Sequence, residues 1–112
     1  MTFNMQEMLG KVQELQQRVN ETQQKLLELE STAEVGGGMV RVTINGKQEI
    51  RKISIEKSVV SPDDIELLED LILSAVNKAI DQSQKMAREE MSKVTSGMLP
   101  NIPGLDLGNF GV

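Results

Sequence analysis

The stretch Gly36–Gly46, GGGMVRVTING, decides the fold of this chain. Three adjacent glycines reach positive φ at little cost and therefore end any helix that precedes them. Beyond them, Val40, Val42 and Ile44 alternate with other residues, and this period of two predicts a half-buried strand. We interpret four residues of this stretch as structural glycines: Gly36, Gly37, Gly38 and Gly46.

Asn45-Gly46 is a strong short-range signal for a hairpin between two strands. The return strand holds Ile53 and Ile55 two residues apart, whereas Ile50 has the opposite parity. We therefore expect a bulge or a longer loop at this hairpin. The residues just before the glycines suit a further short strand, so the prediction is a small antiparallel sheet of three strands over about residues 32–56.

A heptad repeat runs from Met5 to Leu29, ahead of the glycines. Apolar residues fill its a and d positions except at Thr22, which predicts a helix over about residues 3–30 with a narrow apolar stripe. Such a stripe must meet another helix. The residues expected at this dimer or helix seam are Met8, Val12, Leu15, Val19, Leu26 and Leu29.

The same helix carries a line of basic residues, Lys11, Arg18 and Lys25, at heptad spacing. Successive bases are about 10.5 Å apart along the helix, a spacing that suits contacts to phosphates. Each base also follows a glutamate by one helical turn, and such pairs stabilise a helix by roughly 0.2 to 0.5 kcal/mol each. The line is therefore either a phosphate-binding edge or a solvated helix flank.

A second helix is expected over about residues 62–94. Ser61 is placed to cap it, Pro62 suits the first helical position, and Asp63 and Asp64 complement the positive end of the dipole. This role explains the acidic cluster better than a metal site does. The apolar face is wider than that of the first helix, and the C-terminal half is more basic. Its candidate phosphate contacts are Lys85, Arg88 and Lys93.

The composition narrows the classes of function. The chain has 112 residues, no Cys, no His and a formal net charge of −5. Thiol nucleophiles, imidazole bases and Cys or His metal ligands are therefore missing, and we predict no catalytic residue, no metal site and no cofactor. No apolar run approaches the roughly 20 residues of a membrane span, and no signal peptide is recognised. We expect a cytoplasmic protein that is neither an enzyme nor a membrane partner.

The charges are unevenly distributed. Residues 38–60, the strand region, carry five basic and two acidic side chains. Arg41 and Lys52 are expected on the outward face of the hairpin, where they are possible additional DNA contacts. The folded body lacks aromatic residues, which argues against base stacking on single strands. If nucleic acid binds, the backbone or the shape of a duplex is the expected target.

Residues 1–95 are expected to form a single α-β-α domain. One layer of helix on a hairpin buries limited apolar area, so self-association is also expected. The remaining stretch 96–112, SGMLPNIPGLDLGNFGV, contains four Gly and two Pro and predicts a flexible C-terminal tail. Its apolar residues suit a protein partner.

From Gly36 to Ile80 the chain reads GGGMVRVTINGKQEIRKISIEKSVVSPDDIELLEDLILSAVNKAI, after a Met- and Gln-rich helix. This order of parts resembles the YbaB/EbfC family of bacterial nucleoid-associated proteins. The resemblance implies an α+β fold of helix, three-stranded antiparallel sheet and helix, in a two-layer protomer whose dimer holds the helices between two outer sheets. It also implies that the dimer binds DNA like tweezers, with projecting helices.

The residues and the resemblance lead to one hypothesis and one alternative. The hypothesis is a homodimeric protein of the nucleoid that binds duplex DNA mainly through backbone electrostatics and shape. The alternative is a protein-protein interaction module that uses the heptad helix and the apolar C-terminal tail. In that alternative the basic residues are only solvated helix flanks.

Overall fold

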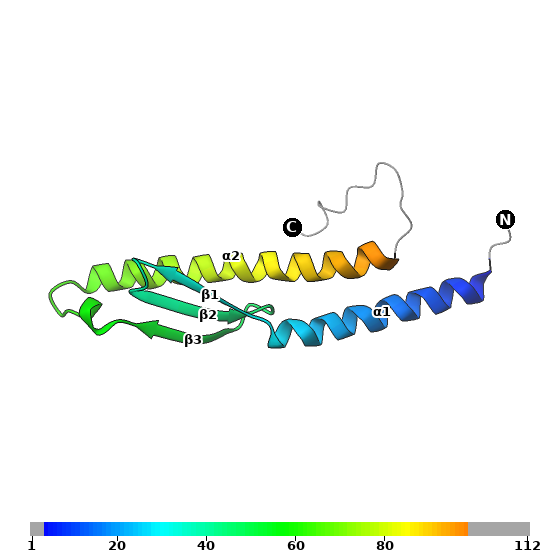
Figure 1. Ribbon diagram of the computed structural model, residues 1–112, viewed down its shortest axis with the longest axis horizontal. Coiled ribbons are helices and arrows are strands. Elements are labelled where there is room, and N and C mark those ends of the chain that lie inside the picture. The colour runs from blue at the N-terminus through cyan, green and yellow to red at the C-terminus, as the bar shows by residue number, and fades with distance from the viewer. Residues whose placement is uncertain (1–3, 99–112) are drawn as a thin grey trace, which may run out of the picture.

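The computed structural model describes residues 4–98, which form one elongated α+β unit (Figure 1). The elements follow in the order α1 (Met5–Glu28), β1 (Glu30–Val35), β2 (Val40–Asn45), β3 (Ile50–Ile55), the 3-10 turn η1 (Lys57–Val59) and α2 (Ile65–Met98). The predicted class, a helix, a three-stranded antiparallel sheet and a second helix, is confirmed. From residue 99 onward, the predicted tail lies outside the described residues.

Helix α1 begins after Asn4, whose Oδ1 accepts a 3.0 Å hydrogen bond from the second helical amide. The C-terminal half of α1 runs alongside α2, and its seam residues Thr22 and Leu26 are buried. The N-terminal turns extend past the end of α2 (Figure 1), and Met8 and Val12 are exposed there. The remaining predicted seam residues are half-buried: Leu15, Val19 and Leu29. Within the described residues, a single copy of the chain therefore covers only part of the seam.

The sheet has the order β1-β2-β3, and both pairs of strands are antiparallel. The β2–β3 connection spans Gly46 to Glu49, and its positive φ of 63° belongs to Gln48. The register of β2 and β3 shifts between Thr43 and Ile44. The hairpin is thus where the sequence predicted it, and the irregularity inferred from the parity of Ile50 is confirmed as both a bulge and a longer loop.

Gly46 allows a close contact with the end of α1. A Cβ atom at this position would lie 2.7 Å from Leu26 Cδ2 and 2.9 Å from the Leu26 carbonyl oxygen. The Gly46 amide donates to the carbonyls of Leu26 at 2.8 Å and Leu29 at 3.1 Å. It thereby satisfies carbonyls that the helix end leaves without helical partners.

The β1–β2 connection contains the three adjacent glycines. Gly36, Gly37 and Gly38 have φ values of 60°, 66° and 92°, a region that other residues rarely adopt. A Cβ atom on Gly38 would also lie 3.0 Å from a guanidinium nitrogen of Arg41. The loop therefore needs glycine for its conformation and for the passage of the arginine side chain.

Helix α2 begins later than the sequence predicted, and the expectation that Ser61 caps it is wrong. The helix starts at Ile65, and Asp64 Oδ1 accepts from Leu67 N at 3.2 Å. Ser61 Oγ instead accepts from Asp63 N at 3.3 Å, in a turn before the helix. Asp64 thereby caps the start of the helix, where its carboxylate also complements the positive end of the helix dipole.

The core lies between α2 and the first two strands. Its buried residues are Ala33 in β1, Val40, Val42 and Ile44 in β2, and Ala75 and Ala79 in α2. Ile53 of β3 lies opposite Val42 and so points to the same face of the sheet. Ile53 is nevertheless 46% exposed, because α2 packs on β1 and β2. The inner face of β3, the face on the same side of the sheet as α2, is therefore left bare, that is, not covered by α2.

Asn45, at the end of β2, is fully buried and joins three parts of the fold. Its Nδ2 donates to Leu27 O at 3.3 Å and to Glu49 Oε1 at 2.8 Å. Its Oδ1 accepts from the amides of Lys47 at 2.9 Å and Glu49 at 3.0 Å. Ser83 Oγ of α2 donates to the Asn45 carbonyl at 2.7 Å. The β2–β3 loop is thereby fixed to both helices.

Candidate nucleic-acid interface

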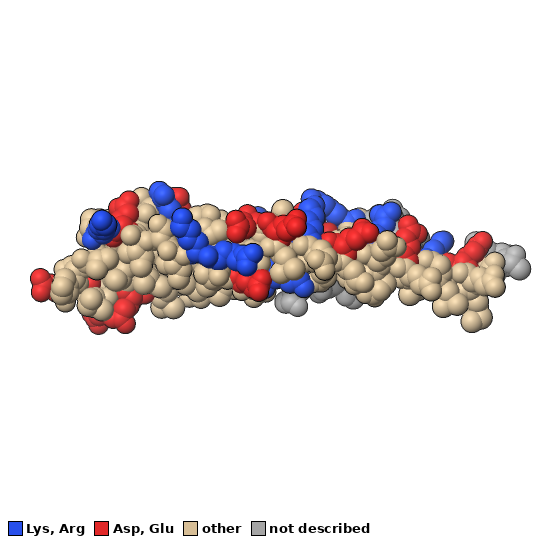
Figure 2. Space-filling view, turned by 90° about the horizontal axis from the view of Figure 1, so that it is seen from below, with Lys and Arg blue, Asp and Glu red and all other residues tan. Residues whose placement is uncertain are grey.

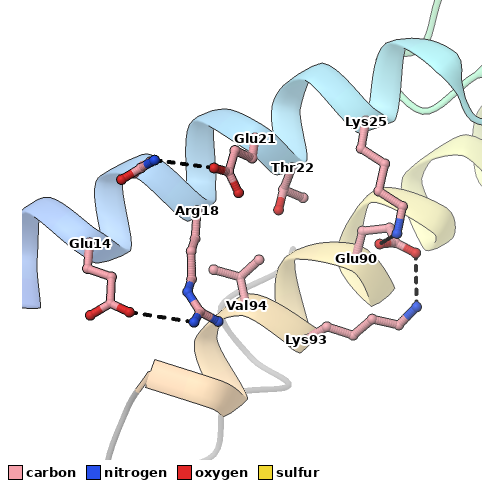
Figure 3. A pocket seen from close by; sticks show the side chains of 9 residues that line it. Glu14, Arg18, Glu21, Thr22, Lys25, Glu90, Lys93 and Val94 are labelled. Atoms are coloured by element: carbon pink, nitrogen blue, oxygen red, sulfur yellow. Dashed lines mark hydrogen bonds and ion pairs between the residues drawn. The ribbon is translucent and has the colours of Figure 1, made fainter.

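A groove of about 530 Å³ lies between the C-terminal half of α1 and the last turns of α2 (Figure 3). Heptad spacing brings Arg18 and Lys25 to one side of α1, and α2 contributes Lys93 from across the groove. Three predicted contacts that are far apart in the sequence thus line one groove. Its other lining residues are Glu14, Gln17, Glu21, Thr22, Glu90 and Val94.

Glu90 of α2 connects the two helices in this groove. Lys25 Nζ lies 2.8 Å from Glu90 Oε2, and Lys93 Nζ lies 3.0 Å from Glu90 Oε1. The Glu90 side chain is 14% exposed. The hydrogen bond from Lys25, followed by that from Lys93, lowers the pKa of the Glu90 carboxyl. Glu90 therefore stays ionised and holds the two lysines together.

Arg18 is held more loosely than the two lysines. It extends from α1 toward the end of α2 and lies 3.5 Å from Glu14, one turn earlier on its own helix (Figure 3). Both side chains are about half exposed, at 50% and 55%. Exposed pairs of this kind contribute about 0 to 1 kcal/mol, so solvent or a ligand phosphate competes easily for Arg18.

The groove is balanced in charge. Arg18, Lys25 and Lys93 are its basic residues, and three glutamates stand beside them. On the face seen in Figure 2, basic and acidic side chains are interleaved along the molecule and do not form one continuous basic patch. A phosphate that enters the groove must therefore draw lysines away from Glu90.

The other three predicted helical contacts lie outside the groove. Lys85 and Arg88 are exposed on α2, whereas the α2 residues Ser83 and Glu90 face the interior. At about 100° per residue, Lys85 and Arg88 fall on roughly the opposite side of the helix from these two residues. Lys11 is exposed near the end of α1 that extends past α2. Within residues 4–98, none of the three forms an ion pair.

Arg41 and Lys52 lie on the face of the sheet that points away from α2. Arg41 alternates with buried residues of β2, and its Nε lies 3.0 Å from Glu34 Oε1 of β1. Lys52 of β3 lies opposite Thr43, which shares that outer face. The eight predicted basic contacts therefore occupy several separate surfaces.

Within residues 4–98, no three acidic side chains gather as ligands for a metal ion. In the same described range, no helix has the length and apolar character needed to cross a bilayer.

A family model described as the YbaB/EbfC DNA-binding family matches residues 1–98. The chain belongs to the YbaB/EbfC family. YbaB/EbfC is a DNA-binding family rather than an enzyme family, and the bacterial relatives of this chain are named nucleoid-associated proteins.

Two relatives show how far the similarity extends. A nucleoid-associated protein of Desulforamulus reducens is 51% identical over 102 residues, which cover 91% of this chain and 95% of the relative. One from Alkaliphilus metalliredigens is 46% identical over 102 residues, covering 91% of this chain and 88% of the relative.

The crystal structure of an uncharacterized protein from Helicobacter pylori superposes on this YbaB/EbfC protein with a TM-score of 0.67. The match covers 88% of this chain and all of that one. The two sequences are 23% identical, so this likeness concerns the fold alone.

Sequence reasoning missed the role of Glu90 in this YbaB/EbfC protein. The repeat on α1 predicts that each base pairs with the glutamate one turn before it, and only Arg18 does so within the described residues. Lys25 pairs across the groove instead. The sequence did contain a signal for this role. The residues Ser83, Ala87, Glu90 and Val94 are three or four positions apart and therefore lie along the side of α2 that faces α1. Glu90 is the charged residue among these four.

Proposed function

We propose that this protein is a cytoplasmic, nucleoid-associated homodimer, not an enzyme, that binds duplex DNA mainly through backbone phosphates. The observation that carries the proposal is the convergence of Arg18, Lys25 and Lys93, from two helices, on one groove. Lys11 extends this line along α1, while Lys85 and Arg88 add charge on the outer side of α2. Arg41 and Lys52 are possible further contacts on the sheet.

The homodimer is supported by the bare inner face of β3. Ile50, Ile53 and Ile55 are 43%, 46% and 36% exposed, although their strand borders the core. Leu73 of α2 is 61% exposed. The three isoleucines lie opposite inward-facing residues of β2 and so share one face of β3, and an exposed apolar surface of this kind marks an interface. A second copy that covers β3 would complete the inner layer and place the helices between two sheets.

The binding energy is expected to be electrostatic and to come from the basic residues in the groove, not from the net charge of the chain. The chain carries −5 overall, so its acidic surfaces repel DNA. In the groove, phosphates replace Glu90 and Glu14 as partners of bases that are already gathered there. Counterions are released from the DNA when its phosphates are neutralised. A plot of the logarithm of the association constant against the logarithm of the salt concentration is therefore expected to have a slope of about −0.9 for each phosphate neutralised.

The test compares two double variants that remove the same charge. Arg18→Gln/Lys93→Gln removes two groove bases and leaves the contact between Lys25 and Glu90 in place. Lys47→Gln/Lys57→Gln removes two exposed bases outside the groove. Fluorescence anisotropy with a labelled duplex at fixed salt is expected to show a clear loss of affinity for the first variant and a small one for the second.

A protein-protein interaction module is the second candidate. It is favoured by the fact that Arg18, Lys25 and Lys93 each already have a carboxylate partner. The tail expected to serve such a partner lies largely outside the described residues. In the same assay, failure of the parent protein to bind duplex DNA even at low salt would support this candidate and contradict the first.

A further inference from the structure

Asn45-Gly46 is a chemically reactive pair of residues as well as a turn. Asn followed by Gly is the dipeptide most prone to deamidation, because glycine has no side chain to keep its nitrogen away from the asparagine amide. It is the only Asn-Gly pair in the sequence, which also has no Asp-Gly pair. In the fold both residues are buried. A reactive pair is thus enclosed where the β2–β3 loop meets α1.

The reaction uses the backbone nitrogen of Gly46 as a nucleophile. Base from the solvent removes its proton, the nitrogen forms a bond with Asn45 Cγ, and Nδ2 takes a proton from water and leaves as ammonia. Water then opens the resulting succinimide ring at either of its two carbonyls, which gives aspartate or isoaspartate. In sum, asparagine and water become an acidic residue and ammonia.

The fold blocks both the loss of the proton and the attack. The Gly46 amide donates to the carbonyls of Leu26 at 2.8 Å and Leu29 at 3.1 Å, and Gly46 is buried, so solvent base does not reach its proton. The Asn45 side chain is also fixed, because Oδ1 accepts from two amides and Nδ2 donates to Glu49 Oε1 at 2.8 Å. Its amide group therefore cannot turn to meet the nitrogen.

We propose that Asn45-Gly46 is a deamidation site that the fold keeps inactive and that reacts when the β2–β3 loop separates from α1. Proteins open locally at a lower free energy than they unfold as a whole. Each opening exposes the Gly46 amide to base, so the frequency of opening sets the rate of deamidation. The inference does not depend on DNA binding.

The product does not fit the closed loop. Aspartate places an oxygen where Asn45 Nδ2 now donates, against the Leu27 carbonyl at 3.3 Å and the Glu49 carboxylate at 2.8 Å. Acceptors then face each other without a proton between them, and two of the groups are charged, which is costly in a buried place. Isoaspartate lengthens the main chain and turns the Asn45 carbonyl, the acceptor of Ser83 Oγ, into a free carboxylate. Deamidation therefore makes a reversible opening permanent.

Peptide mapping by mass spectrometry measures the reaction in the full chain at mildly alkaline pH, in buffer and in urea. The folded protein is expected to deamidate at residue 45 about 100-fold or more slowly than the chain unfolded in urea, since opening breaks several buried hydrogen bonds at once. Equal rates in the two conditions would overturn the proposal.

Ser83→Ala tests whether the contacts of the loop set the rate. It removes the hydrogen bond from α2 to the Asn45 carbonyl and leaves the reacting atoms unchanged. Ser92→Ala, on an exposed side of the same helix, is the matched control. Hydrogen exchange of the Gly46 amide, followed by NMR, reports the same opening independently.

Ser83→Ala is expected to speed exchange and deamidation by the same factor, about 3- to 30-fold for one lost buried hydrogen bond. Ser92→Ala is expected to change neither rate. An unchanged deamidation rate in Ser83→Ala would overturn the proposal, as would an equal increase in Ser92→Ala.

Refolding tests whether the opening becomes permanent. Chain held in urea at mildly alkaline pH until residue 45 has reacted is expected to lose its native circular dichroism signal after dilution. Chain held in urea for the same time at mildly acidic pH, where base is scarce, is expected to recover that signal. Full recovery of the native signal and Tm by the reacted chain would show that the product fits the closed loop, and would overturn this part of the proposal.

Discussion

The contact between Gly46 and the end of α1 allows the packing of the β2–β3 loop to be tested with one methyl group. Gly46→Ala adds a Cβ atom 2.7 Å from Leu26 Cδ2 and 2.9 Å from the Leu26 carbonyl oxygen. The side chain can rotate away, but the carbonyl belongs to the helix backbone and moves only if the helix end moves. Because Gly46 does not have a positive φ, backbone strain adds nothing to the effect.

The size of the effect follows from three terms. Overpacking of this kind typically costs about 1 to 3 kcal/mol. A shift of the loop also weakens the two hydrogen bonds from the Gly46 amide, each worth about 1 kcal/mol. The smaller conformational freedom of alanine in the unfolded chain returns about 0.4 to 1 kcal/mol. We expect a net loss of about 1 to 3 kcal/mol in the free energy of unfolding.

Gly10→Ala is the matched control, since it adds the same methyl group where nothing lies within 4 Å. Gly10 is in the middle of a helical segment, so alanine is expected to stabilise the protein by about 0.5 to 1 kcal/mol. Thermal unfolding followed by circular dichroism can detect both the expected loss of stability in Gly46→Ala and the expected gain in Gly10→Ala. A change of 1 kcal/mol in the free energy of unfolding shifts Tm by about 4 to 8 °C in a domain of this size. Protein concentration must be equal for the two variants, since the unfolding of the proposed dimer would depend on protein concentration. A Gly46→Ala protein with an unchanged or raised Tm would refute the packing argument.

Three further predictions concern the polar network, the bare strand and the groove. Asn45→Ala is expected to lower the free energy of unfolding by about 1 to 3 kcal/mol in urea denaturation, because buried partners lose their hydrogen bonds; an unchanged urea midpoint would count against that role. Ile53→Asp is expected to give monomers in size-exclusion chromatography, whereas Ser54→Asp, on the outer face of the same strand, is expected to leave the dimer intact; a dimeric Ile53→Asp protein would remove β3 from the interface. Glu90→Gln releases both lysines and is expected to tighten duplex binding and steepen the salt dependence by about 0.9 for each additional phosphate contacted. Weaker binding by Glu90→Gln would show that Glu90 is needed to position the lysines rather than competing for them.

The sequence was most informative where the signal is local. Adjacent glycines, alternation in β2 and the heptad of α1 each depend on neighbouring residues, and they predicted the order and type of the main elements. The parity of Ile50 even predicted the irregular register of β3. The start of α2 was missed because Ser61 and Asp64 are both good caps, and local sequence does not decide between them.

The contacts that depend on distant segments were not predictable. Asn45 and Gly46 looked like turn residues, but the fold uses one as a buried hydrogen-bonding centre and the other as a space for α1. Glu90 is separated from Lys25 by 65 residues, so their pairing depends on how α1 packs on α2. The same packing selects Arg18, Lys25 and Lys93 as one group out of six candidate helical bases.

The most direct test of the central proposal is to locate bound DNA relative to the groove. Gln17 lines the groove on α1, whereas Gln16 is exposed on the opposite side of the same helix from the groove residues. Because the chain has no Cys, Gln17→Cys and Gln16→Cys can each carry one photo-crosslinker on the otherwise unchanged protein. The proposal predicts efficient cross-linking to duplex DNA from residue 17, weak cross-linking from residue 16, and loss of the residue 17 product at high salt. Equal cross-linking from both positions, or a stronger product from residue 16, would contradict the claim that DNA binds in the groove.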